Sequence, residues 1–138
     1  MTPAAAALAH FDARLAFETD CDDVAAELAE LVVIDARSPE AFAAGHVPGA
    51  LSLPRPFAAS DVPDGPLVVY CWGPACNGAV KAARELALIG RAAKEMLGGF
   101  EYWVREGHPV EGHDAERLAA AADTAGLVRL PGAISCLC

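Results

Sequence analysis

Two uninterrupted apolar runs constrain the fold of this chain more than any other feature. Residues 31–35 (Leu-Val-Val-Ile-Asp) and 67–70 (Leu-Val-Val-Tyr) contain no alternation of apolar and polar side chains. Such runs are typical of strands in a parallel sheet that is covered on both faces. Helical patterns separate the apolar runs, so strands and helices alternate along the chain. The sequence therefore predicts an α/β fold with a central parallel sheet flanked by helices on both faces.

The other elements follow from caps, breakers and apolar spacing. Three further strands are predicted over residues 15–19, 50–53 and 92–97. Helices are predicted over residues 3–13, from a cap at Asp20 or Asp22 to residue 28, and over 39–45, 77–90, 100–107 and 114–125. These elements predict one domain over residues 1–112, with its core in 15–112 and its N-terminal helix in 3–13. Residues 113–138 are expected to form a C-terminal helix and a tail that ends in cysteines.

Composition excludes several classes of function. The chain has 138 residues and a formal net charge of −9, which argues against nucleic acid and anionic membranes as partners. No apolar run approaches the ~18 residues of a membrane span. The first residues lack the basic stretch of a signal peptide, so a cytoplasmic protein is expected. In that compartment, five cysteines indicate thiol chemistry or metal binding rather than structural disulfides.

Cys71 is the principal candidate for chemistry. It directly follows the apolar run 67–70, and a short loop separates it from the helical pattern that begins near Asn77. A thiol at that place lies among backbone N–H groups at the positive end of a helix, which lowers a thiol pKa and makes a nucleophile. The other interpretation is an inert buried cysteine.

Several motifs occur together and in a fixed order along the chain. They are Val33-Ile34-Asp35-Ala36-Arg37 with Glu40 and Phe42, then Gly45-His46-Val47-Pro48-Gly49-Ala50, Val68-Val69-Tyr70-Cys71, Lys81-Ala82-Ala83-Arg84-Glu85-Leu86 with Gly90, and Leu97-Gly98-Gly99-Phe100 with Trp103, Gly107, Pro109 and Val110. This series resembles the signatures of rhodanese-like sulfurtransferase domains, over roughly residues 15–112. The resemblance implies a parallel sheet with helices on both faces.

The resemblance also implies an activity and its site. It implies a sulfurtransferase that moves a sulfane sulfur through a persulfide on Cys71 to a thiol or another nucleophilic acceptor. The donor would be a small molecule such as thiosulfate or a persulfide, and no cofactor or metal is implied. The loop that holds the outer sulfur or the substrate anion corresponds to Trp72, Gly73, Pro74, Ala75, Cys76 and Asn77. This loop departs from the family pattern because it has no arginine and carries a second cysteine.

The additional cysteines each leave two interpretations open. Cys76 is either a resolving thiol for the Cys71 persulfide or a small residue near a helix start. Cys136 and Cys138 end the chain as Cys-Leu-Cys, and are either a mobile dithiol that reaches Cys71 or part of an ordinary tail. Cys21 lies among acidic residues, which raise a thiol pKa, so an inert thiol is expected there.

Two other residues are expected to have structural roles. His46 lies in a Pro-Gly turn, where a ring nitrogen can satisfy a backbone group. Asp35, at the end of a strand, is expected to hold Arg37 or a loop amide. The remaining histidines show no spacing typical of metal ligands.

Two alternative functions share the predicted fold. One is a non-catalytic persulfide carrier or a regulatory docking module. The other is an oxyanion enzyme such as a phosphatase or an arsenate reductase. That alternative ranks last, because such an enzyme needs an arginine at the end of the loop, where Asn77 and Gly78 stand instead.

Overall fold

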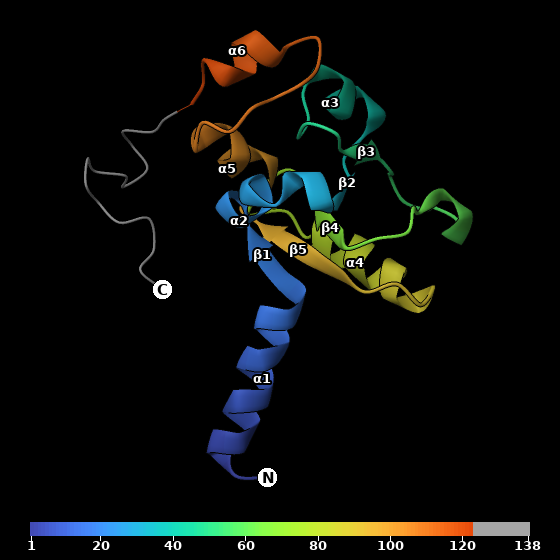
Figure 1. Ribbon diagram of the computed structural model, residues 1–138, viewed down its shortest axis with the longest axis vertical. Coiled ribbons are helices and arrows are strands. Elements are labelled where there is room, and N and C mark those ends of the chain that lie inside the picture. Colours follow the sequence, from blue (N-terminus) through green and yellow to red (C-terminus); the bar gives the residue numbers. More distant parts are fainter. Residues whose placement is uncertain (123–138) are drawn as a thin grey trace, which may run out of the picture.

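The two apolar runs form adjacent strands of a five-stranded sheet in the computed structural model, which describes residues 1–122 (Figure 1). The strands are β1 (Glu18–Asp20), β2 (Val32–Asp35), β3 (Leu51–Ser52), β4 (Leu67–Tyr70) and β5 (Ala93–Leu97). Their order in the sheet is β1-β5-β4-β2-β3, and every pair of neighbours is parallel. The predicted parallel sheet is therefore confirmed, with β4 at its centre.

Alternate residues of the central strands point to opposite faces, and both faces are buried. Val33 and Val68 pair across β2 and β4 and belong to one apolar cluster, while Ile34 and Val69 pair in the same way and belong to a second cluster. Each of these four side chains is at most 2% exposed. Burial on both faces explains why neither run shows the alternation of a half-exposed strand.

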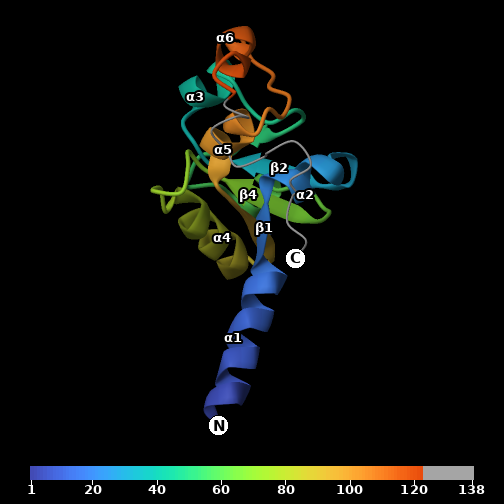
Figure 2. The ribbon, with the colours of Figure 1, turned by 90° about the vertical axis from the view of Figure 1, so that its left-hand side faces the viewer.

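The α-helices among residues 1–122 are α1 (Pro3–Phe17), α2 (Cys21–Ala26), α3 (Pro39–Ala44), α4 (Gly78–Leu88), α5 (Gly99–Arg105) and α6 (Ala115–Ala119). Those that bury side chains against the sheet lie on both of its faces. Side chains of α2 and α5 pack into the first cluster, and side chains of α4 pack into the second. Figure 2 shows α4 on one side of the sheet and α2 on the other. The predicted arrangement of helices on both faces is confirmed.

The N-terminal helix is longer than predicted. It continues through Phe17, where a strand was expected over residues 15–19, and the strand begins only at Glu18. No glycine or proline interrupts the helix after Pro3, and Arg14 pairs with Glu18 across one helical turn at 3.0 Å. The apolar residues near its end therefore belong to a helix that projects from the domain without a buried side chain (Figure 1). No helix among residues 1–122 is both long and apolar enough to cross a membrane.

The C-terminal prediction is tested only in part. Helix α6 ends at Ala119, whereas the pattern predicted a helix over residues 114–125. Cys136 and Cys138 lie outside the described residues.

Candidate active site

Cys71 lies at the carboxyl edge of the sheet, where parallel α/β folds place their sites. The start of α5 fixes the position of this residue. The N–H of Phe100 donates to the carbonyl of Cys71 at 3.0 Å, and the N–H of Glu101 donates to the carbonyl of Trp72 at 2.9 Å. Gly99 permits this approach, because a Cβ there would lie 2.8 Å from the Cys71 carbonyl oxygen, and its φ is +61°.

A tight turn brings the second cysteine of the loop against Cys71. The N–H of Cys76 donates to the carbonyl of Gly73 at 3.0 Å, with Pro74 at the second position of the turn, where proline is favoured. The two sulfur atoms consequently lie 2.9 Å apart, and both thiols are free and half-buried. Gly78 leaves room for them, because a Cβ at that position would lie 2.6 Å from Sγ of Cys71.

The two thiols of the loop have pKa values shifted in opposite directions. Burial, followed by the hydrogen bond with Cys76, raises the pKa of Cys71 to about 11. The hydrogen bond from Cys71, followed by one from the N–H of Gly78 at 3.3 Å, lowers the pKa of Cys76. The prediction of a lowered Cys71 pKa is therefore wrong. The reason is that Cys76 is the more exposed thiol and takes the charge, while Cys71 keeps the shared proton.

A small cavity opens beside the two sulfur atoms. Its volume is about 160 Å³, and it is lined by Cys71, Gly73, Pro74, Cys76, Ala79, Glu95, Met96, Leu97, Gly98 and Gly99. Liquid water occupies ~30 Å³ per molecule, so the cavity accepts a group of a few atoms only. None of the described residues that line it is basic.

The predicted substrate loop contributes unevenly to this cavity. Gly73, Pro74 and Cys76 line it, whereas Ala75 and Asn77 are exposed and do not. Pro74 has no N–H, and the N–H of Cys76 is already used within the turn. Trp72 is 56% exposed and lines a neighbouring cavity of about 560 Å³ instead, although its N–H interacts with the Cys71 sulfur and favours the thiolate.

A buried polar network holds the strand end that carries Cys71. The Tyr70 hydroxyl donates to the Asp35 carboxylate at 2.6 Å and accepts from the Val47 N–H at 3.1 Å. Arg37 binds the same carboxylate through its side chain at 2.7 Å and through its backbone N–H at 2.9 Å. The predicted role of Asp35 is therefore confirmed. No feature of the sequence indicates this role of the Tyr70 hydroxyl, because the apolar neighbours of Tyr70 indicate only a buried strand.

Two other predictions for individual residues are tested by the structure. The Nδ1 atom of His46 lies 2.7 Å from the carbonyl of Phe42, and the two rings stack, so a structural role is confirmed. Cys21 is buried, and its pKa is raised well above the ordinary range. Burial is the largest cause and the acidic neighbours come second, so the direction predicted was right and the main reason was not.

Comparisons with known proteins agree with this geometry. The family model of the rhodanese-like domain matches residues 20–106, which is more than half of the chain. The chain belongs to the rhodanese-like domain family. The matched region of this rhodanese-like domain includes Cys71, the turn that follows it and all five strands except the first two residues of β1.

Three relatives illustrate the range of the family. The BH2092 protein from Bacillus halodurans has 37% sequence identity and a TM-score of 0.73, and the match covers 86% of this chain and 90% of that one. A thiosulfate sulfurtransferase GlpE from Pseudomonas putida is 34% identical over 87 residues, which cover 58% of this chain and 74% of that enzyme. The HTH-type transcriptional regulator Rv0324 from Mycobacterium tuberculosis is 34% identical over 89 residues, which cover 62% of this chain. The match spans only 39% of that regulator's length.

Proposed function

We propose that this rhodanese-like domain is a sulfurtransferase and that Cys71 carries the transferred sulfur as a persulfide. The observation that supports this most directly is the position of the Cys71 thiol, which directly follows the central strand and lines a cavity of about 160 Å³. A cavity of that size suits a small sulfur donor better than an organic substrate, because drug-sized ligands occupy ~300 Å³ or more.

The proposed reaction begins with the proton that the two thiols share. Cys71 passes this proton to the Cys76 thiolate, 2.9 Å away, and its own sulfur attacks the sulfane sulfur of the donor. With thiosulfate, a new S–S bond forms on Cys71 and sulfite leaves with the electron pair of the bond that breaks. A thiolate acceptor then attacks the outer sulfur and carries it away, and the Cys71 thiolate is regenerated.

Cys76 has a second role in this proposal, as a resolving thiol. When no acceptor arrives, its thiolate attacks Sγ of the Cys71 persulfide, which forms a Cys71–Cys76 disulfide and expels hydrosulfide. The distance of 2.9 Å between the two sulfur atoms favours this step, and an external dithiol would then reduce the disulfide. Cys136 and Cys138 remain candidates for the same role or for that of acceptor.

The charge of the cavity favours one class of donor. Glu95 lines the cavity, and its pKa is raised by burial and by Glu18. A carboxylate disfavours a dianion such as thiosulfate and no basic side chain among the lining residues compensates, so we infer that a persulfide is the better donor. The reaction needs reduced thiols, which the cytoplasm maintains, so we place the protein there.

Steady-state turnover tests the proposed function. The full-length protein is assayed with thiosulfate and with a low-molecular-weight persulfide, each with a thiol acceptor, beside the Cys71→Ser variant. We expect turnover with both donors, a higher kcat/KM for the persulfide, and no turnover by the variant. Equal rates for the variant and the wild type would contradict the assignment of Cys71.

A regulatory module is the second candidate function. The similarity to part of an HTH-type transcriptional regulator favours this function, because the region similar to this chain is there one part of a regulatory protein. A regulatory or carrier domain would take up sulfur on Cys71 without multiple turnover. The same assay therefore separates the two functions, since a burst of one sulfur per chain without turnover would indicate the carrier.

A further inference from the structure

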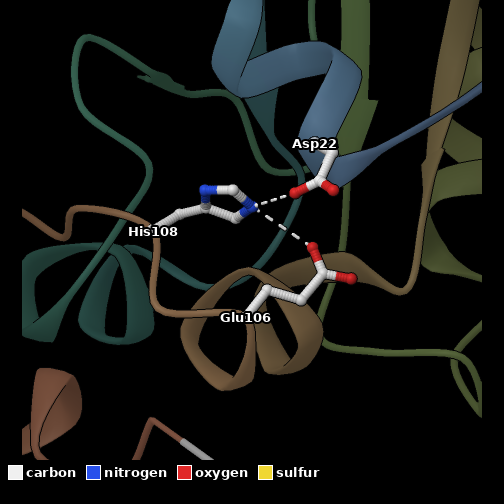
Figure 3. A group of neighbouring side chains, drawn as sticks. All are labelled: Asp22, Glu106 and His108. Carbon is white, nitrogen blue, oxygen red and sulfur yellow. Dashed lines mark hydrogen bonds and ion pairs between the residues drawn. The ribbon is translucent and has the colours of Figure 1, made fainter. Parts of the chain in front are cut away.

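Three potential metal-binding side chains meet away from the thiols, between α2 and the end of α5 (Figure 3). They are Asp22 in the first turn of α2, Glu106 at the C-terminal cap of α5, and His108 two residues later. The Nε2 atom of His108 lies 2.9 Å from a carboxylate oxygen of Asp22 and 3.2 Å from one of Glu106. Figure 3 shows both carboxylates directed at the same ring nitrogen.

The two distances from Nε2 are close to those between neighbouring ligands of a metal ion. Zn²⁺ holds nitrogen and oxygen ligands at about 2.0–2.1 Å, so two ligands of a tetrahedral site stand about 3.3 Å apart. The two distances from Nε2 are 2.9 and 3.2 Å, and the three ligand atoms all lie within 4.8 Å of one another. If Nε2 moved by a few tenths of an ångström and the carboxylate oxygens of Asp22 and Glu106 moved closer together, the three atoms could occupy three positions around one metal ion.

The surroundings favour a cation at this place. The three side chains are partly buried, with side-chain exposures of 15% for His108, 24% for Glu106 and 38% for Asp22, so one side remains open to solvent. The ring of His108 packs against buried Trp103, with 4.7 Å between the ring centroids, which holds the imidazole in place. The chain as a whole carries a formal charge of −9, which raises the local concentration of cations.

We propose that Asp22, Glu106 and His108 bind a divalent transition-metal ion, with Zn²⁺ and Mn²⁺ as the ions that suit one imidazole and two carboxylates. The ion would lie between Nε2 and the two carboxylates and bind the lone pair of Nε2, which requires the neutral imidazole that carries its proton on Nδ1. Water completes the coordination on the exposed side. The bound ion ties α2 to the end of α5 and thereby joins two segments that are more than eighty residues apart in the sequence.

The site is independent of the sulfur chemistry. Neither Cys71 nor Cys76 belongs to this group of residues, and no step of the sulfur transfer proposed above involves a metal ion. The spacing of the histidines in the sequence does not indicate this site, because His108 and Glu106 are close in the sequence but Asp22 comes from a helix near the start of the chain. Failure of this proposal would therefore leave the proposed sulfurtransferase function untouched.

Manganese titration tests the site on the full-length protein. Mn²⁺ is chosen because thiolates prefer softer ions, so the cysteines compete little for it. Electron paramagnetic resonance of free Mn²⁺ gives the number bound, and paramagnetic broadening of amide signals in NMR spectra gives the place. We expect one ion per chain, displaced by Zn²⁺, with the signals of Asp22 and His108 broadened before those around Cys71.

Two ligand variants and one control complete the design. Asp22→Asn and His108→Gln are each expected to weaken Mn²⁺ binding by about tenfold or more, because each removes a ligand. Glu111→Gln is the matched control: it removes a carboxylate that lies 3.7 Å from His46, in a pair to which residues 1–122 add no third ligand, and should leave binding unchanged. Asp22→Asn changes a partly exposed side chain, so its folding, checked by circular dichroism, should be unaffected.

Either of two results would overturn the proposal. The first is that millimolar Mn²⁺ does not bind and that Zn²⁺ does not bind to protein whose accessible thiols have been alkylated. The second is that a folded Asp22→Asn variant binds as tightly as the wild type, which would place the ion elsewhere.

Discussion

Replacing Cys76 by serine should lower the pKa of Cys71 and so make it the more reactive thiol. In the wild type, the thiolate of Cys76 lies 2.9 Å from the Cys71 sulfur and opposes a second negative charge. Two unit charges at that distance repel each other by about 1.4 kcal/mol even at the dielectric constant of water, and more in a partly buried loop. Because 1.36 kcal/mol corresponds to one pH unit, the pKa of Cys71 should fall by about one unit or more.

The opposite pKa shifts of the two cysteines predict that the Cys71 pKa falls when Cys76 is replaced. Cys71 is now the thiol with the raised pKa and Cys76 the one with the lowered pKa, so raising the pH ionises Cys76 first. Serine cannot take that charge, and its hydroxyl can donate a hydrogen bond to a Cys71 thiolate. At a fixed pH near neutrality, the variant therefore holds a larger fraction of Cys71 as thiolate than the wild type does.

Alkylation with iodoacetamide at a series of pH values, followed by peptide mapping, measures this effect. In the wild type, Cys76 should be labelled at lower pH than Cys71. In Cys76→Ser, the midpoint for Cys71 should move down by about one pH unit or more, and Cys76→Ala serves as a control without a hydroxyl. Labelling of Cys71 before Cys76 in the wild type, or an unchanged Cys71 midpoint in both variants, would refute the coupling.

Three further outcomes are expected. Gly78→Ala should slow sulfur loading by about tenfold or more, because the Cβ of alanine would lie 2.6 Å from the Cys71 sulfur. The same variant should change the free energy of unfolding by less than about 1 kcal/mol, because alanine suits a helix. A normal loading rate would show that the space beside the sulfur is not needed. Tyr70→Phe should reduce the free energy of unfolding, measured by urea denaturation, by about 1–3 kcal/mol, since the N–H of Val47 loses its buried acceptor. An unchanged urea midpoint would contradict the role of the hydroxyl. Cys76→Ser should prolong the lifetime of the Cys71 persulfide by about tenfold and stop hydrosulfide release in the absence of an acceptor, whereas continued release would assign the resolving role to another thiol.

The sequence was sufficient to predict the sheet and the place of Cys71, the proposed nucleophile. The runs that became β2 and β4 contain β-branched residues without alternation, and this pattern has one common structural cause, burial on both faces. Cys71 follows such a strand directly, so its position at the carboxyl edge of the sheet followed from chain order alone. The end of α1 was harder to place, because Leu15 and Phe17 suit a strand as well as a helix.

What the sequence did not predict depends on distances between side chains. The 2.9 Å approach of Cys76 to Cys71 depends on the turn at Gly73, and together with burial it raises the Cys71 pKa that the sequence was expected to lower. The local pattern shows that Cys76 lies in the same loop as Cys71, but it does not show that the two sulfur atoms are close enough for one thiol to take the charge from the other. The meeting of Asp22 with His108 is likewise a product of the tertiary fold, which packs α2 beside α5.

The most direct test of the central claim is the location of the sulfur itself. The wild type, Cys71→Ser and Cys76→Ser are each incubated with a sulfane donor, and intact mass spectrometry with peptide mapping then counts and places the added sulfur. The proposed mechanism predicts one added sulfur on Cys71 in Cys76→Ser, the same loading in the wild type before resolution, and none in Cys71→Ser. One sulfur gained by Cys71→Ser at the wild-type rate would contradict the mechanism and make another cysteine the nucleophile.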